Sequence, residues 1–261
     1  MIDRRVLLVA PSVLLLATAM PAAAAGGLRW EGRHLLLRVE VNGKPADALI
    51  DFNVRRTLID RRHARMLGVA SAGDSVIIET AGRRLGPLNA AVIDLTDYAN
   101  YALRGRIGLV LGRDLFVAGP WRLDLGTPSL SPSTIRGVRR GRPLPLSDRS
   151  GFPTIPVAIN GVTARAALSF RDLEAMRVGA VFAARIGLAR PRGTAAVHDL
   201  AARGCAAGIN RLDVADIHID DVDAALEAND HAPDVWLGPA ILRRFRIGID
   251  LAADTLWLAP A

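Results

Sequence analysis

A strand–turn–strand pattern that occurs twice constrains the fold of this chain more than any other feature of its sequence. Val39-Glu40-Val41-Asn42-Gly43 in the first half matches Val157-Ala158-Ile159-Asn160-Gly161 in the second half. Both copies end in Asn-Gly, the dipeptide that most strongly favours a tight β-hairpin. A second strand is expected after each turn, over 46–50 and 164–168. The chain therefore contains two copies of one β unit.

The repeat extends beyond the hairpins and predicts the domain organisation. A short helix that ends at a glycine is expected in each copy, over 63–68 and 183–187. Residues rich in Pro, Gly and Arg separate the copies at 136–152 and are typical of a solvated linker. We expect an all-β fold of two pseudo-symmetric lobes with one short helix each, over 26–135 and 153–261. At 261 residues and 51% hydrophobic, the chain is long and apolar enough to form both cores.

Residues 1–25 have the features of a signal peptide. Arg4 and Arg5 precede an apolar stretch from Val6 to Met20, and small residues at 21–25 supply a cleavage site. We therefore expect a periplasmic or secreted protein with no membrane span after cleavage. An uncleaved anchor helix is the alternative, and the arginine pair leaves both general and twin-arginine export open.

The charge of the chain does not predict a nucleic-acid partner. The net charge is +7, but Lys44 is the single lysine and the arginines are scattered among acidic residues. Cys205 is the only cysteine, which excludes a framework of internal disulfides. The histidines that lie near aspartates match no established metal motif, so we expect no metal and no cofactor. These histidines are His198, His218 and His231.

The order of the motifs resembles the retropepsin-like aspartic proteases, in the tandem form in which one chain carries both lobes. In that family each lobe has a strand that runs into Asp-Thr-Gly, and a later apolar-apolar-Gly element lies beside that loop. Here Leu49-Ile50-Asp51 and Ala167-Leu168-Ser169 take the first position, and Val110-Leu111-Gly112 and Trp236-Leu237-Gly238 take the second. The resemblance covers nearly the whole mature chain. It implies two acid-protease-like lobes with a cleft between them.

The catalytic motif departs from the family in both copies. Asp-Thr-Gly reads Asp51-Phe52-Asn53 in the first half and Ser169-Phe170-Arg171 in the second. An aspartic protease uses two carboxylates that share one proton, and a serine hydroxyl cannot replace the second. Loss of a general acid or base typically lowers the rate by about 10²–10⁴. The resemblance thus implies that Asp51 is vestigial or the sole catalytic acid, and that Ser169 marks the lost partner.

Phenylalanine stands at the same position in both motifs, where the family has threonines whose hydroxyls bond across the symmetry axis. We expect Phe52 and Phe170 to pack against each other and to replace those hydrogen bonds with an apolar contact. The alternative is that each ring packs within its own lobe. Asp51 could also form a structural ion pair with Arg171.

These features predict a catalytically degenerate protein that binds a peptide or an extended protein segment in the cleft between the lobes. The candidate binding residues are Phe52, Asn53, Phe170 and Arg171. Two alternatives stay open. One is an active aspartic peptidase that uses Asp51, and the other is a structural protein of the cell envelope.

Overall fold

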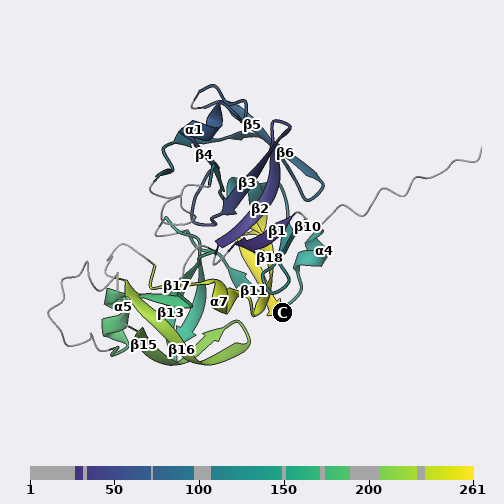
Figure 1. Cartoon of the computed structure of the whole chain (residues 1–261). Helices are drawn as coiled ribbons and strands as arrows, with labels where there is room; N and C mark the ends of the chain where they lie inside the picture. Colours follow the sequence, from purple (N-terminus) through teal and green to yellow (C-terminus); the bar gives the residue numbers. More distant parts are fainter. Residues whose placement is uncertain are drawn as a thin grey trace, which may run out of the picture.

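The chain forms two β lobes joined by a sheet that lies between them (Figure 1). The all-β, two-lobe fold expected from the sequence is confirmed. No helix within the described residues is long and apolar enough to cross a bilayer. The predicted signal peptide, Arg171 and Cys205 lie outside the described residues. The computed structural model describes residues 27–31, 34–71, 73–96, 107–148, 151–170, 174–188, 206–227 and 233–261.

The first lobe, at the top of Figure 1, is an eight-stranded sheet. Its strands follow the order β6-β5-β2-β3-β8-β4-β7, and β1 pairs with β2. The strands are β1 (Leu28–Glu31), β2 (His34–Val41), β3 (Lys44–Ile50), β4 (Leu58–Asp60), β5 (Ser75–Thr80), β6 (Arg83–Asn89), β7 (Ala91–Ile93) and β8 (Leu109–Leu111).

The second lobe is a closed barrel with the strand order β12-β13-β17-β14-β16-β15. Its strands are β12 (Thr154–Ile159), β13 (Val162–Leu168), β14 (Met176–Gly179), β15 (Ala206–Val214), β16 (Ile217–Glu227) and β17 (Val235–Leu237).

Each lobe carries the short helix that the repeat predicts, α1 (Arg61–Ala64) in the first and α5 (Ala180–Arg185) in the second. The glycine expected after each helix has left-handed backbone, with φ of 73° at Gly68 and 71° at Gly187. A residue without a Cβ adopts this conformation at little cost, so the two helices end in the same way. The described residues also form three further helices, α3 (Asp114–Val117), α4 (Ile135–Val138) and α7 (Pro239–Leu242).

The sheet between the lobes, here called the central sheet, takes strands from both halves of the chain. Its order is β10-β9-β18-β19-β11, and it lies between the lobes in Figure 1. One of its edge strands, β11, lies within the segment 136–152. The end of the chain therefore returns to pair with the first half. The strands are β9 (Trp121–Asp124), β10 (Ser129–Pro132), β11 (Arg142–Pro145), β18 (Phe245–Asp250) and β19 (Thr255–Pro260).

The two Asn-Gly turns fold alike and connect equivalent hairpins. Asn42 and Asn160 have positive φ angles of 51° and 49°, which the tight turn requires. The Asn42 side-chain oxygen accepts a hydrogen bond of 3.0 Å from the backbone N–H of Ile77 on β5. The Asn160 oxygen accepts one of 3.0 Å from Arg211 on β15. Each asparagine thus shapes its own turn and ties it to the next hairpin of its lobe.

One hydrophobic core runs through both lobes and the central sheet. In β9 of that sheet, Trp121 and Leu123 are buried whereas Arg122 is exposed. Because side chains alternate along a strand, one face of the central sheet packs into this core and the other face is polar.

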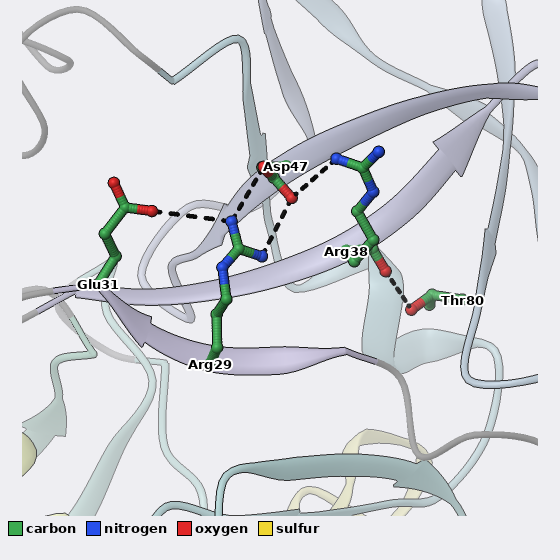
Figure 2. Close-up of polar contacts among 5 residues, drawn as sticks. All are labelled: Arg29, Glu31, Arg38, Asp47 and Thr80. Atoms are coloured by element: carbon green, nitrogen blue, oxygen red, sulfur yellow. Dashed lines mark hydrogen bonds and ion pairs between the residues drawn. The ribbon is translucent and has the colours of Figure 1, made fainter.

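A cluster of charged residues links three strands of the first lobe (Figure 2). Asp47 on β3 lies 3.0 Å from a nitrogen of Arg29 on β1 and 3.3 Å from a nitrogen of Arg38 on β2. Arg29 also lies 3.7 Å from Glu31, and the Arg38 carbonyl accepts a hydrogen bond from Thr80. The hydrogen bond from Arg29, with a smaller contribution from Arg38, holds the pKa of Asp47 below its ordinary value.

Candidate functional site

The loop that carries Asp51 is held by backbone hydrogen bonds at the end of β3. This strand runs parallel to β8, and the Asp51 N–H donates to the Leu111 carbonyl at 3.0 Å. The Asp51 carboxylate accepts a hydrogen bond of 2.9 Å from the N–H of Asn53. Only 2% of Asp51 is exposed, so the one carboxylate of the predicted dyad is enclosed by protein.

The second half builds the same loop with the same backbone contacts. Its strand β13 runs parallel to β17, and the Ser169 N–H donates to the Leu237 carbonyl at 2.9 Å. Ser169 is 1% exposed, and its buried hydroxyl oxygen has no hydrogen-bond partner among the described residues. The structure therefore places Ser169 at the position equivalent to Asp51, as the repeat predicts.

The glycine after β8 and the glycine after β17 both pass close to the backbone of a neighbouring segment. A Cβ on Gly112 would lie 2.7 Å from the carbonyl oxygen of Val54, and one on Gly238 would lie 2.1 Å from that of Glu174. Both distances are too short for any side chain. Glycine at these two positions thus follows from the close packing of the backbone beside each loop.

The rings of Phe52 and Phe170 contact each other edge to face across the junction of the lobes. Their centroids are 6.4 Å apart with an interplanar angle of 69°, and each residue is 1% exposed. The predicted contact between the rings is confirmed. Phe116 of α3 also packs on Phe52, at 5.6 Å, and was not identified from the sequence. Its only sequence signal was an apolar residue in a short segment after Gly112.

Asn53 makes a hydrogen bond between the lobes that the sequence did not predict. Its side-chain nitrogen donates to the backbone carbonyl of Leu168 at 2.8 Å. Leu168 precedes Ser169, so this bond joins the two loops directly. The oxygen of the same amide is buried, and it has no hydrogen-bond partner within the part of the chain that the structure describes. A polar contact across the pseudo-symmetry axis is thus present, but it comes from the third residue of the motif and not from the second.

Among the described residues of the two equivalent loops, Asp51 is the one carboxylate, whereas the chemistry of an aspartic protease requires two. The equivalent position holds a hydroxyl, which stays neutral and cannot share a titrating proton with Asp51. The motif positions that are described are buried or half-buried, and the rings beside them are enclosed. The roles proposed for Arg171 fall outside the described residues.

Of the three histidines that the sequence places near aspartates, the structure describes His218, which lies in the β15–β16 hairpin of the second lobe. His218 on β16 contacts Asp213 on β15, and Arg211 also donates to that carboxylate, at 2.8 Å. The hydrogen bond from Arg211, followed by that from His218, lowers the pKa of Asp213. His218 and Arg211 are exposed, and this cross-strand cluster is typical of a solvated hairpin. His198 and His231 lie outside the described residues.

A cavity of about 440 Å³, here called the inter-lobe cavity, lies beside the junction. At its edge Arg113 donates to Asp148 at 3.0 Å, and Arg55 lies 3.6 Å from the same carboxylate. The cavity is not lined by Asp51 or Ser169. Its walls come from the first lobe, from the segment that joins the halves and from the end of the central sheet. They are Arg55, Arg113, Asp114, Val117, Leu146, Asp148, Pro153, Leu251 and Asp254.

Comparisons with known proteins support the fold class. No protein-family model matches the sequence, and no curated protein matches it. Among solved structures, Basic 7S globulin from soybean is similar over 90% of this chain and 94% of its own, with a TM-score of 0.56 and 10% identity. A retropepsin-like aspartic protease from Rickettsia conorii is similar over 45% of this chain and 87% of its own, with a TM-score of 0.34 and 18% identity. The chain has an aspartic-protease-like fold.

Proposed function

We propose that this chain is an exported protein of aspartic-protease-like fold that lacks peptidase activity and binds a peptide or an extended protein segment between its lobes. The observation that carries the proposal is the pair of equivalent loops, in which Asp51 on one side corresponds to Ser169 on the other. Peptide hydrolysis by this fold needs a charged carboxylate to activate water and a neutral one to donate to the peptide carbonyl. A single carboxylate cannot hold both states at once.

The binding part of the proposal rests on the inter-lobe cavity. Its volume of about 440 Å³ lies within the range of about 300–1,000 Å³ that is typical of ligand sites. Its lining combines apolar groups such as Val117 and Leu251 with charged groups such as Arg55 and Asp254. An extended chain presents both apolar side chains and polar backbone groups, so this lining suits a peptide.

A peptidase assay tests the loss of activity. The purified protein is incubated with an unfolded protein substrate between about pH 3 and pH 6, where carboxylates titrate. We expect no cleavage beyond that seen with the Asp51→Asn variant. Cleavage that depends on Asp51 and is blocked by a transition-state mimic would contradict the proposal and establish the peptidase alternative.

A pair of valine variants tests the binding site. Val117 lines the inter-lobe cavity and is 67% exposed, and Val181 on α5 lies outside that lining and is 68% exposed. We expect the purified protein to retain a subset of peptides from a random peptide array. Val117→Arg should abolish this binding because it places a long charged side chain in the cavity, whereas Val181→Arg should leave it unchanged. Equal binding by both variants would exclude this cavity as the site.

The first residue of the mature protein tests export. We expect mass spectrometry of the protein recovered from its native host to show a chain that begins near residue 26. Recovery of the full-length chain from the cytoplasm would contradict this part of the proposal.

A structural role in the cell envelope is the second candidate, and the enclosed rings of Phe52 and Phe170 favour it because they fill the junction. This role predicts that the protein co-fractionates with the envelope and retains no peptide from the array.

A further inference from the structure

A second cavity lies on the polar face of the central sheet, away from the inter-lobe cavity. Its volume is about 280 Å³, and its lining includes three arginines and two serines. We call it the arginine pocket. Its lining side chains with polar groups are Arg122, Asp124, Ser129, Ser131, Arg140 and Arg246.

The polar residues of the pocket form two rows that run across neighbouring strands, and the strand register brings the residues of the first row together. Arg122 on β9 is opposite Ser131 on β10 and, on its other side, opposite Gly248 on β18. Gly248 has no side chain, and a Cβ there would lie 2.4 Å from the carbonyl oxygen of Val138 in α4. The backbone of α4 therefore packs directly on this strand and forms one wall of the pocket. Arg140 follows that helix and contributes a second guanidinium.

The second row lies two residues further along the same strands. Asp124 is opposite Ser129 on β10 and Arg246 on β18. The Arg246 side chain lies 3.6 Å from the Asp124 carboxylate. The other oxygen of Asp124 accepts hydrogen bonds of 3.0 Å from the N–H groups of Gly126 and Thr127. The negative charge of Asp124 is therefore paired with Arg246, and one of its carboxylate oxygens already accepts hydrogen bonds from the backbone.

Two positive charges of the pocket stay unmatched. Arg122 and Arg140 have no carboxylate within ion-pair distance in the part of the chain that the structure describes. With Arg246 paired to Asp124, the lining carries a net charge of two positive units. The serine hydroxyls of Ser129 and Ser131 add donors that are half-buried on the same face.

We propose that the arginine pocket binds a dianionic phosphate group. A guanidinium presents a planar set of donors that matches the oxygens of a phosphate, and hydroxyls complete the coordination of such groups. The two unmatched charges equal the charge of a phosphate monoester near neutral pH. The volume lies just below the range of about 300–1,000 Å³ for larger ligands, which suits a small anionic group. The net positive charge of the whole chain also favours the approach of anions.

Calorimetric titration of the purified protein with inorganic phosphate tests the proposal. We expect saturable binding at one site, and Arg122→Gln and Arg140→Gln should each weaken it by about tenfold because each removes charge-assisted hydrogen bonds. Arg65→Gln is the matched control, because Arg65 is an exposed arginine at the end of α1 in the first lobe. A thermal melt without phosphate should give the same Tm for all three variants and the native protein.

Two further titrants identify the source of the phosphate. Glycerol 3-phosphate represents a soluble phosphomonoester, and phosphatidylcholine vesicles that contain phosphatidic acid represent a lipid headgroup. Binding of either that is weakened by Arg122→Gln but not by Arg65→Gln supports the pocket and names the source.

Three outcomes would overturn the proposal. The first is that neither inorganic phosphate nor the two further titrants bind. The second is an equal loss of binding in Arg65→Gln and Arg122→Gln, which would show that the anion responds only to the overall charge. The third is equally tight binding of acetate, which would show that the pocket does not select a dianion.

Discussion

The loops that carry Asp51 and Ser169 have the same backbone contacts but different chemical groups. Each N–H donates to the last residue of the neighbouring parallel strand, at 3.0 and 2.9 Å, and each loop buries a phenylalanine next in sequence. The side chain at the first position of the motif differs, Asp51 against Ser169, and so does the residue at the third position, Asn53 against Arg171. Main-chain hydrogen bonds and ring packing therefore hold both loops, and neither interaction requires a second carboxylate.

The junction of the lobes combines an apolar contact and a polar one. The two rings come from equivalent positions of the repeat, whereas the hydrogen bond from Asn53 to Leu168 joins residues that are not equivalent. The apolar contact thus joins matching positions of the two loops and the polar contact does not. This comparison leads to four predictions.

The largest effect is expected when one of the paired rings is removed. Phe170→Ala should lower the free energy of unfolding by about 3–5 kcal/mol, because it leaves a cavity in a fully buried contact. A double-mutant cycle with Phe52→Leu and Phe170→Leu, followed by urea unfolding, should give a coupling energy of about 0.5–1.5 kcal/mol. Phe182 of α5 is the control, since Phe52→Leu and Phe182→Leu should be additive. Additivity in the first cycle would show that the rings do not stabilise each other.

Restoring a carboxylate in the second loop should destabilise the protein. Ser169→Asp buries a second acid in a loop equivalent to that of Asp51, so we expect a loss of about 3–5 kcal/mol at neutral pH. Burial and the neighbouring charge raise the pKa of the new acid in the folded state. The folded state therefore binds more protons than the unfolded state, and the loss of stability should diminish as the pH falls through the raised pKa.

Ser169→Ala is the matched control for that variant. It removes a buried hydroxyl for which the described residues offer no hydrogen-bond partner, so the stability of the protein should change by less than about 1 kcal/mol at every pH. Urea unfolding as a function of pH measures both variants. A Ser169→Asp protein as stable as Ser169→Ala at neutral pH would show that the second loop still accommodates a charged acid.

The hydrogen bond between the lobes should have an intermediate effect. Asn53→Ala removes the 2.8 Å donor to the Leu168 carbonyl, and we expect a loss of about 1 kcal/mol in the free energy of unfolding. Chemical denaturation measures this loss. An unchanged stability would mean that water replaces the amide without cost and that the rings alone hold the two loops.

The smallest effect is expected for the charged cluster around Asp47 in the first lobe. The described residues form no equivalent cluster at the junction of the lobes. Because the pKa of Asp47 is lowered in the folded protein, ionised Asp47 stabilises the fold fully above about pH 3.8, its ordinary pKa. This stabilisation is lost as the pH falls through the lowered pKa. Asp47→Asn should therefore lower the free energy of unfolding by less than about 1 kcal/mol at neutral pH, because the ion pair with Arg29 is partly exposed. In strong acid the substitution should have no effect. A cost independent of pH would contradict an electrostatic origin.

Much of the fold was predictable because its signals are local. Alternation of apolar and polar residues, the two Asn-Gly turns and the glycines after the helices each act over a few residues, and the duplication made each signal count twice. The ring contact was also predictable, since Phe52 and Phe170 occupy equivalent positions of a symmetric repeat. The contact of Phe116 and the role of Asn53 were not, because both depend on distances between segments that the sequence does not relate.

The duplicated hairpins and the correspondence of Ser169 to Asp51 follow from the sequence, because both lie in short motifs whose spacing is preserved. The pairing of β9 with β18, which brings Arg122, Asp124 and Arg246 together, is visible only in the folded chain. Pairing of strands so far apart is selected by the core that their apolar faces share, and the polar side chains on the opposite face come together as a consequence.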